Sequence, residues 1–411
     1  METLGVFVVA LGGLVMGSGA WPFKLMRRFQ FEHWWFVGMF VGLVAMPWAI
    51  TLLGCPGAIE GLRGVPLQAI LLANVFALGW GVANVLCGLC FVRIGVALTG
   101  AILAGLGVSV GSIVPLVFKG SGGFEDAPDL VSRAGLTVLF GVAVMLAGVV
   151  LAAKAGFARD RELKRANQPS GGAFLGGLVM TIVAGVLSTG TAFVFIYSQG
   201  PIVSNLSIVR PAGSVKVTVK GAPELSGERR VDEDGTIRVA DGIAVPAGGL
   251  RASEAARRIG EKIAEARGAN APSVAVDTGS IPANFGVWAV GLAAGALVNL
   301  AYAAYLLTKK RSWGVLLERP GEVLLAVVIG INFSVAVALM GKGMLLLGAI
   351  GGSVGWGIQQ AMQMTGSQAL GFLSGEWRGV SKRPKAQMAL AIATLLVAAG
   401  ILAYSRSLAA S

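Results

Sequence analysis

The sequence contains little charge, little cysteine and almost no histidine. Only 13% of its 411 residues are charged, whereas an ordinary soluble domain carries roughly 25%. One histidine and three cysteines form no cluster with metal spacing and no disulfide framework. We interpret Cys87 and Cys90, a CxxC pair inside an apolar stretch, as buried helical thiols rather than a redox or metal pair.

Catalytic motifs are missing as well. The glycine-rich stretches lack a strand-to-helix phosphate loop, and no Asp or Glu lies in the middle of a long apolar stretch. We therefore expect no enzymatic activity, no cofactor and no metal. The formal charge of +12 suggests a nucleic-acid partner, but its distribution along the chain favours membrane orientation instead. We expect no nucleic-acid binding.

Apolar residues are abundant and make up 55% of the chain. A membrane-spanning helix needs about 20 mostly apolar residues. The first apolar stretch follows a single charge, Glu2, and lacks the basic segment of a secretory signal, so we interpret it as a retained helix. The ninth could be interrupted at Gly351-Gly352. Ten stretches are long enough to span a membrane: 3–21, 35–53, 67–91, 95–118, 132–153, 172–197, 284–307, 322–340, 344–372 and 386–404.

The basic residues are distributed unevenly among the loops. Of the 33 Lys and Arg, seventeen lie in loops after odd-numbered stretches and five in the other short loops and the C-terminal tail. The remaining eleven lie in the long segment after the sixth stretch. Positive charge in short loops marks the cytoplasmic side, whereas long segments translocate regardless of charge. Both termini and the long segment are therefore predicted to face outward, away from the cytoplasm.

The long segment, residues 198–282, has the composition of a soluble domain. Residues 215–219 and 274–276 are predicted strands, and Asp234-Gly235 is a hairpin turn signal between 229–231 and 237–239. Residues 253–266 predict an amphipathic helix with apolar positions 255, 256, 259, 263 and 266. We expect an inserted α+β domain of about 70 residues, bounded by the breakers Gln199-Gly200-Pro201 and Ile281-Pro282.

The membrane part, residues 1–197 with helices 1–6 and residues 283–411 with helices 7–10, contains a weak internal repeat. Residues 13–23 resemble 185–195 at an offset of 172, and 147–152 resemble 399–404 at an offset of 252. The offsets differ by nearly the length of the inserted segment. Together they indicate two five-helix halves, and an odd number of helices per half makes the repeats inverted, as in many secondary transporters.

One stretch combines an aromatic side chain with several amides. Four residues of the ninth stretch follow i, i+3, i+4, i+7 spacing and share one helix face. Such a face suits a sugar-like solute, because amides bond hydroxyls and an aromatic ring covers the C–H surface. Hydrogen bonding between packed helices is the alternative for all of these residues. The candidate substrate-binding residues are Trp80, Asn84, Asn299, Tyr302, Asn332, Trp356, Gln359, Gln360 and Gln363.

Carboxylates occur only near the ends of the apolar stretches. Glu322 and Glu376 lie near cytoplasmic helix ends, where we expect solvated or capping roles, and Glu32 is expected to pair with the basic run at 24–28. These residue patterns alone therefore identify no coupling ion.

Seven sequence blocks of the membrane part share a family resemblance: Ala20-Trp21-Pro22-Phe23-Lys24, Phe31-Glu32, Met46-Pro47-Trp48-Ala49-Ile50, Trp80-Gly81-Val82-Ala83-Asn84, Arg93-Ile94-Gly95, Gly375-Glu376-Trp377 and Arg383-Pro384. They resemble the L-rhamnose–proton symporter (RhaT) family of the drug/metabolite transporter superfamily. The resemblance implies a ten-helix fold of inverted five-helix repeats and proton-coupled sugar uptake.

Five sequence blocks of the inserted segment occur in a characteristic order: Val217-Thr218-Val219, Pro223-Glu224-Leu225-Ser226-Gly227, Asp234-Gly235-Thr236-Ile237, Gly249-Leu250-Arg251-Ala252-Ser253-Glu254-Ala255 and Pro272-Ser273-Val274-Ala275-Val276. They resemble the periplasmic domain of outer-membrane polysaccharide export proteins. This resemblance implies a module for oligomerisation or partner docking in residues 198–282. It also implies a Gram-negative-type envelope, in which the chain lies in the bacterial inner membrane with both termini and the insert on the periplasmic side.

The sequence as a whole predicts an all-α polytopic membrane protein of about ten helices with an inserted small α+β periplasmic domain. The function that we expect is a permease for a sugar or similar small polar solute, with the lipid bilayer around its helices. The RhaT resemblance implies that transport is coupled to protons. The alternative is an envelope-assembly protein whose insert docks partners and whose helices serve mainly as an anchor.

Overall fold

The computed structural model describes residues 2–94, 96–118, 128–163, 172–240, 242–268, 270–347 and 354–409. The chain divides into two compact units. The first, which we call the helical unit, comprises Met1–Met46, Asn74–Ile196 and Leu292–Ser411. The second, which we call the insert unit, comprises Pro47–Ala73 and Tyr197–Gly291.

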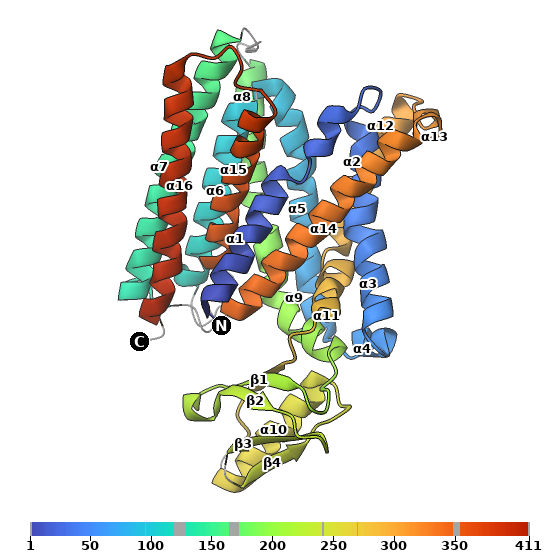
Figure 1. The fold of residues 1–411 in the computed structure, drawn as a ribbon, viewed down its shortest axis with the longest axis vertical. Coiled ribbons are helices and arrows are strands. Elements are labelled where there is room, and N and C mark those ends of the chain that lie inside the picture. Colours follow the sequence, from blue (N-terminus) through green and yellow to red (C-terminus); the bar gives the residue numbers. More distant parts are fainter. Residues whose placement is uncertain are drawn as a thin grey trace. The chain divides into compact units, whose positions relative to one another are not determined.

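Helices dominate the chain and occur in each of the ten apolar stretches (Figure 1). The elements before the insert are α1 (Glu2–Ser18), the 3₁₀ turn η1 (Trp21–Leu25), α2 (Phe31–Phe40), the π-helical η2 (Val41–Ala45), α3 (Met46–Gly54), α4 (Ala58–Arg63), α5 (Leu67–Ile94), α6 (Val96–Val117), α7 (Arg133–Glu162), α8 (Gly172–Ser188) and α9 (Gly190–Leu206). Those after it are α11 (Ile281–Gly286), the π-helical η5 (Val287–Gly291), α12 (Ala293–Lys309), α13 (Gly314–Glu318), α14 (Pro320–Leu347), α15 (Trp356–Leu373) and α16 (Lys382–Ala409).

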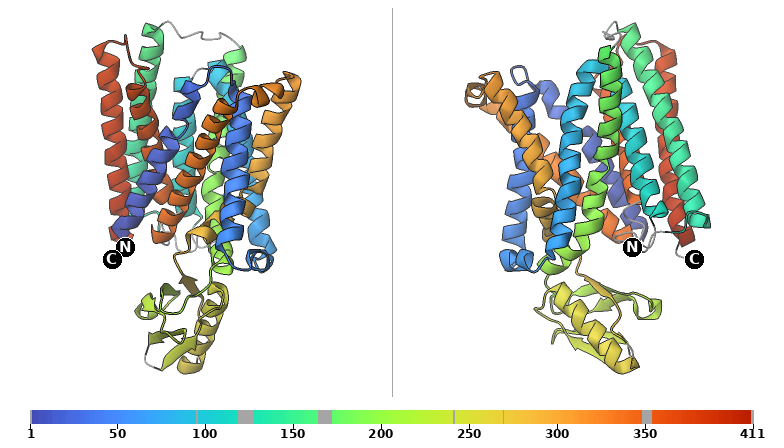
Figure 2. Two further views of the ribbon diagram at one scale, coloured as in Figure 1. Left: turned by 45° about the vertical axis from the view of Figure 1, so that its right-hand side comes forward. Right: turned by 180° about the vertical axis from the view of Figure 1, so that it is seen from behind.

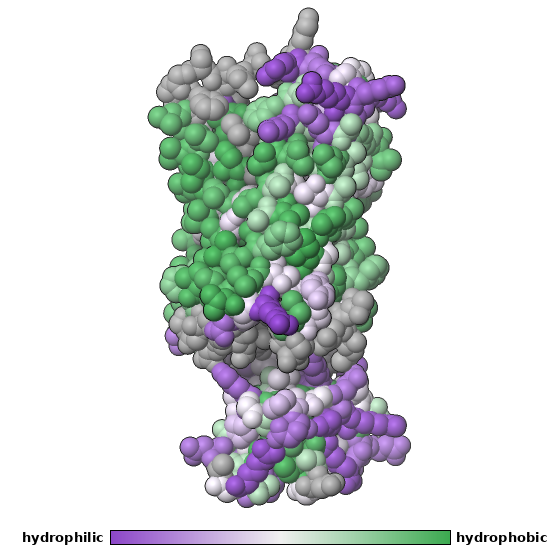
Figure 3. Space-filling model, turned by 90° about the vertical axis from the view of Figure 1, so that its left-hand side faces the viewer, coloured by the Kyte–Doolittle hydropathy of each residue, from purple (hydrophilic) through white to green (hydrophobic). Residues whose placement is uncertain are grey.

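Seven helices within the described residues are long and apolar enough to cross a membrane, or eight if the pair interrupted at Leu292 is one span. Part of α6, Ile102–Val117, is a shorter apolar helix. Apolar side chains cover the face of the helical unit seen in Figure 3, and hydrophilic ones gather at one of its ends. Such a belt matches the hydrocarbon core of a bilayer. The chain is therefore a polytopic membrane protein, and the ten-span inverted layout stays a prediction.

Small residues let the helices of the helical unit approach closely. A Cβ on Gly148 of α7 would lie 3.0 Å from Leu395 Cδ2 of α16, and one on Gly12 of α1 would lie 2.9 Å from the Ala336 carbonyl oxygen of α14. No hydrophobic driving force acts between helices in lipid, so van der Waals packing at such close contacts drives their association. α1 begins and α16 ends at the same end of this unit, and η1 and α13 lie at the other (Figures 1 and 2).

Two boundary predictions are tested by these helices, and a third is not. α9 continues through Pro201 to Leu206, so the prediction that residues 199–201 end the helix is wrong. Asn205 Nδ2 donates to the Pro201 carbonyl at 2.8 Å within this last turn. α14 continues to Leu347, past the predicted limit at 340. The predicted interruption at Gly351-Gly352 lies outside the described residues.

The insert forms a small α+β domain. Its elements are β1 (Ser214–Val219), a 3₁₀ turn η4 (Pro223–Leu225), β2 (Gly227–Arg230), β3 (Thr236–Ala240), β4 (Ile243–Pro246), α10 (Ala252–Arg267) and β5 (Val274–Asp277). An antiparallel sheet has the order β2-β1-β5, with Val217 opposite Val276, and β3 pairs with β4, with Ile237 opposite Val245.

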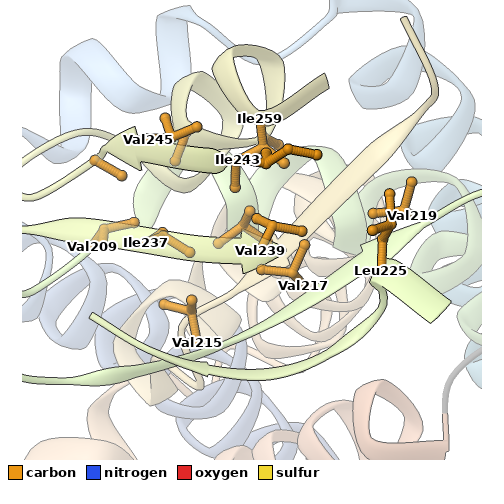
Figure 4. Close-up of a cluster of buried hydrophobic side chains, with 14 of the residues drawn as sticks. Val209, Val215, Val217, Val219, Leu225, Ile237, Val239, Ile243, Val245 and Ile259 are labelled. Carbon is orange, nitrogen blue, oxygen red and sulfur yellow. The ribbon is translucent and has the colours of Figure 1, made fainter. Parts of the chain in front are cut away.

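The insert buries its own hydrophobic core. Alternate residues of β1, namely Val215, Val217 and Val219, point inward with Ile237 and Ile259 (Figure 4). This burial confirms the period of two in 215–219 and the amphipathic helix at 253–266. Ala266, predicted to be buried, is exposed, because the buried stripe of α10 ends at Ile263 near the helix terminus.

The predicted hairpin turn at Asp234-Gly235 is present. Gly235 has a φ of +84°, the left-handed region that favours glycine, and Val231 bridges Ile237. The flanking segments do not form one long hairpin, however, because β2 pairs with β1 and β3 with β4. β4 was not predicted, since its four residues are too few to show a period.

Candidate functional site

The predicted stripe of polar and aromatic side chains lies on α15, between α1 and α6. Gln359 Nε2 donates to Gln363 Oε1 at 2.9 Å, and Trp356 Nε1 donates to the Gly107 carbonyl of α6 at 3.1 Å. Trp356 and Gln359 are buried, and Gln360 and Gln363 are half-buried. The stripe therefore lies inside the helical unit rather than on its lipid-facing surface.

One polar atom of this stripe lacks a partner. Gln359 is 2% exposed, and its Oε1 accepts no hydrogen bond from the residues that the structure describes. An unsatisfied buried acceptor costs about 1–3 kcal/mol. The amide is held in place because its Nε2 is engaged by Gln363. An oriented, unsatisfied acceptor of this kind is suited to accept a hydrogen bond from a hydroxyl group of a ligand.

α1 and α6 both approach α15 through glycines. A Cβ on Gly17 of α1 would collide with the carbonyl oxygen of Gln363, and one on Gly111 of α6 would lie 2.5 Å from Trp356 Cδ1. Gly111 is therefore a close-packing glycine, because the Trp356 indole fills the space where a side chain would lie. Gly107 has a different environment, with polar side chains nearby.

The sixth apolar stretch is interrupted beside this stripe. α8 ends at Ser188 and α9 begins at Gly190, with Thr189 between them. A Cβ on Gly107 would lie 3.1 Å from Ser188 Oγ and 3.4 Å from Gln360 Nε2. Leu175–Leu206 nevertheless forms one apolar span, so the turn at Thr189 is a local irregularity and not a broken helix. Ser188 was not predicted, although the run Ser188-Thr189-Gly190 interrupts an otherwise apolar stretch and is a detectable signal.

Two of the other predicted site residues are engaged by neighbouring helices. Asn299 Nδ2 donates to the Gly295 carbonyl at 2.8 Å, and Asn299 Oδ1 accepts from Trp35 Nε1 at 3.2 Å. Asn332 Nδ2 donates to the Gly19 carbonyl just beyond α1 at 3.0 Å. These contacts match the packing alternative for both asparagines.

The remaining predicted residues lie on α5 and α12. Trp80 faces Phe333 of α14, with 6.4 Å between ring centroids. Trp80, Asn84 and Tyr302 are half-buried. From the predicted set, the structure brings together the four α15 residues, whereas these three side chains lie on other helices.

A cluster of ion pairs lies at the end of the helical unit that holds η1. Lys24 Nζ contacts Glu376 Oε1, and Arg159 Nη1 lies 3.3 Å from Glu376 Oε2. The Arg159 guanidinium also lies over the Trp377 ring, 5.3 Å from its centroid. Glu376 thus joins the segment after α1, the end of α7 and the α15–α16 connection, which is more than the solvated or capping role that we expected.

A second group of contacts ties α2 to the α12–α14 connection. Lys310 Nζ donates to Glu32 at 3.0 Å, and His33 Nε2 lies 3.3 Å from the Ser312 carbonyl. The expectation that Glu32 pairs with the basic run at 24–28 is therefore wrong, because α12 packs against α2 and brings Lys310 to it. Glu322, in the first turn of α14, accepts the backbone N–H groups of residues 27–29, which lie in the loop before α2. It therefore holds this loop, whereas we had expected it to be solvated or to cap a helix.

Comparison with known proteins identifies two similarities. Residues 2–202 match the family described as L-rhamnose-proton symport protein (RhaT), and residues 204–278 match the family described as polysaccharide biosynthesis/export protein. Both resemblances inferred from the sequence are confirmed over these residues. The blocks at 375–377 and 383–384 lie outside the first match, so their resemblance stays a prediction.

Curated relatives agree with the first match. L-rhamnose-proton symporters of Shigella boydii serotype 18 and of Escherichia coli O1:K1 / APEC are each 27% identical over 191 residues, which are 46% of this chain and 54% of the relative. The chain thus spans about half the length of the curated relatives it matches. These relatives are named as transporters rather than enzymes.

Proposed function

We propose that this protein is a secondary transporter of a sugar or similar small polar solute, working by proton-coupled uptake across the bacterial inner membrane. The similarity of residues 2–202 to L-rhamnose-proton symporters supports the class of solute and the coupling. The observation that carries the proposal is the buried, unsatisfied Oε1 of Gln359 within the α15 stripe. A protein that merely anchored a domain would gain nothing from this costly acceptor.

The solute site consists of Trp356, Gln359, Gln360 and Gln363, with the indole covering the C–H face of the solute and the amides bonding its hydroxyls. Trp80, Asn84, Asn299, Tyr302 and Asn332 form the surrounding shell in this proposal. Asn299 and Asn332 would contribute by holding Trp35 and the end of α1 in place, because their side chains are already bonded to those neighbours.

Two inverted five-helix halves would provide alternating access to this site. The pairing of corresponding helices supports this arrangement, since α7 packs on α16 and α2 packs on α12. The ends of two helices support it as well. α1 ends at Ser18 and α8 at Ser188, close to positions related by the repeat offset of 172.

The proposed orientation places both termini and the insert in the periplasm and the Glu376 cluster in the cytoplasm. The excess of Lys and Arg in the short loops on one side supports it. A cysteine introduced at Ser226 should react with an impermeant thiol reagent in intact spheroplasts. Reaction only after lysis would show that Ser226 faces the cytoplasm and that the proposed orientation is wrong.

Solute binding is tested by thermal stabilisation of the purified full-length protein with L-rhamnose, L-fucose, D-glucose and D-galactose. A ligand at 100 times its dissociation constant should stabilise the protein by about 2.7 kcal/mol. Gln359→Ala should weaken binding, and Gln368→Ala, which removes an amide near the end of the same helix, should not. Equal binding by both variants would refute the site, and binding of no sugar would refute the proposed solute class.

A second function is favoured by the match of residues 204–278 to polysaccharide biosynthesis/export proteins. In this alternative the insert docks an envelope partner or a second copy of the chain, and the membrane helices mainly anchor it. Co-purification of a specific partner that depends on the insert, in a protein that binds no solute, would favour this function over transport.

A further inference from the structure

The first turn of α2 contains the chain's one histidine beside a buried carboxylate. Glu32 is 1% exposed and His33 is 2% exposed. Glu32 is also the only buried Asp or Glu in the part of the chain that the structure describes. Charged side chains are almost never fully buried unless they are paired, and histidine is the residue whose charge changes most readily near neutral pH. The two neighbours are therefore a candidate proton-binding pair.

The hydrogen bonds of the imidazole show where its proton lies. The backbone N–H of Gln30, the residue before α2, donates to His33 Nδ1 at 3.1 Å. Because an N–H can only donate, Nδ1 carries no proton. The proton of the neutral ring therefore lies on Nε2, which donates to the Ser312 carbonyl at 3.3 Å. His33 is thus a neutral ring that closes the first turn of α2 and reaches the segment between α12 and α13.

Glu32 provides an acceptor for a second proton on this ring. Lys310 Nζ, at the end of α12, donates to Glu32 Oε2 at 3.0 Å. It lies equally close to Glu32 Oε1 but not in hydrogen-bonding geometry, so Oε1 is buried without a hydrogen bond from the described residues. This oxygen is 3.9 Å from His33 Nδ1. A proton on Nδ1 would therefore have a carboxylate oxygen close by to accept a hydrogen bond from it.

Few other charges surround the pair on the elements that pack against α2. Glu322 of α14 holds the preceding loop through its backbone N–H groups, Lys24 of η1 is engaged by Glu376, and η2 carries no charge. Tyr302 and Lys342 lie farther along α12 and α14. One carboxylate thus faces one ammonium and one neutral imidazole. The other titratable residues of these elements and their connections are exposed: Arg27, Arg28, Tyr305, Lys309, Arg311, Glu318 and Arg319.

A proton on Nδ1 is incompatible with the contact that now closes this turn. Two donors, the Nδ1 proton and the Gln30 N–H, would face each other across 3.1 Å. Turning Nδ1 toward Glu32 relieves this clash, and the Gln30 N–H then loses its acceptor. We infer that His33 and Glu32 form a proton-binding site, in which His33 Nδ1 takes up one proton, Glu32 Oε1 accepts a hydrogen bond from it, and the first turn of α2 is released.

This site goes beyond the proposed function, because it needs no solute. No Asp or Glu lies in the middle of a long apolar stretch, so the start of α2 supplies a proton-binding group that the apolar stretches lack. The same turn contacts Lys310 and Ser312 (α2, α12 and α13 are labelled in Figure 1). Proton uptake therefore loosens the contacts between α2 and the α12–α13 connection.

The single histidine allows a direct test on the full-length protein, purified with a histidine-free tag and reconstituted in phosphatidylcholine vesicles. Nitrogen NMR of protein that carries isotopically labelled histidine reports one imidazole. At about pH 8 the proton should lie on Nε2 alone, and Nδ1 should gain a second proton as the pH falls to about 5.5. A proton on Nδ1 already at the higher pH, or none at the lower pH, would refute the site.

Hydrogen exchange of residues 29–34 measures the release of the turn. After correction for the effect of pH on intrinsic exchange, these amides should exchange roughly tenfold faster at the lower pH, as expected for loss of a helix cap. The start of α7 is the internal control. There Ser132 Oγ accepts the Gly135 N–H at 3.0 Å, and a hydroxyl does not titrate in this range, so its corrected exchange should be the same at both pH values.

Two variants separate the proton from the fold. His33→Gln keeps an acceptor at the third helical position, as Gln does in a capping box, but takes up no proton, so exchange of the turn should become independent of pH. In Glu32→Gln, Nδ1 should require a lower pH to gain its proton. Glu318→Gln, at an exposed position of α13, is the matched control and should titrate as the parent does.

Persistence of the pH-dependent exchange in His33→Gln would refute the site, and so would protonation of Nδ1 without faster exchange in the parent. If neither variant folds, the NMR titration and the exchange of the parent decide the question without them. None of these measurements involves a sugar. Failure of this site would therefore leave the proposed function standing, and absence of sugar binding would leave this site standing.

Discussion

Arg251 clamps the inserted domain onto the membrane-proximal part of the insert unit. Its Nη1 donates to the Asn205 carbonyl at the end of α9 at 2.7 Å, and its Nη2 donates to the Gly57 carbonyl before α4 at 2.8 Å. A Cβ on Gly61 would lie 2.5 Å from Arg251 Nη1, so a glycine is needed for this approach. Arg251→Ala should therefore loosen the attachment without changing the core of the insert.

The magnitude follows from the two bonds that are lost. A hydrogen bond to a charged group contributes about 1.5–3 kcal/mol. The bond to Gly57 is solvent-exposed and counts for less, while the bond to Asn205 is half-buried. We expect Arg251→Ala to lower the free energy of local opening by about 2 kcal/mol, which raises the population of the opened form roughly thirtyfold.

Cys55 is a natural reporter for this opening. It is 3% exposed and lies in the same unit, just after α3. Burial raises the pKa of the Cys55 thiol, and the charge of Arg251 partly opposes this rise. Removing Arg251 alone would therefore leave less thiolate and slow the reaction with maleimide. An increase in the labelling rate, located at Cys55 by mass spectrometry, can come only from opening.

Two control variants make the result decisive. Arg251→Lys keeps the charge but loses the forked geometry, so its labelling rate should lie between those of the parent and Arg251→Ala. Arg210→Ala removes an exposed arginine of the same domain and should label at the parent rate. If Arg251→Ala also labels at the parent rate while remaining folded, the clamp contributes nothing and the reasoning is wrong.

Three further predictions concern other parts of the chain. Glu376→Gln should lower stability by about 1 kcal/mol in thermal unfolding, because it removes the charge that joins Lys24 and Arg159, and Glu318→Gln should leave the transition unchanged. Hydrogen bonds from Arg257 and Arg258 hold the pKa of Glu254 at about 2, below its ordinary value of about 4.3. The insert should therefore lose stability as the pH falls from about 4 through 2, and Glu254→Gln should flatten this dependence. Replacing residues 208–279 by a Gly/Ser linker should leave solute binding intact, and loss of binding in a folded variant would place the insert in the transport machinery.

Local sequence patterns predicted the helices and most strands of this protein because both depend on periodicity. The alternation of Val215, Val217 and Val219 predicts a strand with one buried face, and these three residues are buried in β1. α9 was cut short at Pro201 in the prediction because proline usually ends a helix. The helix nevertheless continues to Leu206, where side chains such as Asn205 bond the carbonyl of Pro201.

Contacts between distant residues were not visible in the sequence. Glu32 lies next to a basic run, yet its partner is Lys310, 278 residues away. Ser188 and Gly107 carry no chemical motif, and only the folded helical unit brings them to Gln360. The α15 stripe was predictable because its four residues share one helix, whereas the groups that complete the candidate site come from other helices.

The Arg251 clamp also changes how the inserted domain should be understood. The sequence indicates a self-contained module, and its buried core agrees with that. Yet the domain shares a compact unit with Pro47–Ala73, which contains α4 and the start of α5. Arg251 and Ser253, at the start of α10, both bond Asn205 at the end of α9. The insert is therefore attached to Pro47–Ala73 and to the last turn of α9 by specific hydrogen bonds, and not only through the two ends of its chain.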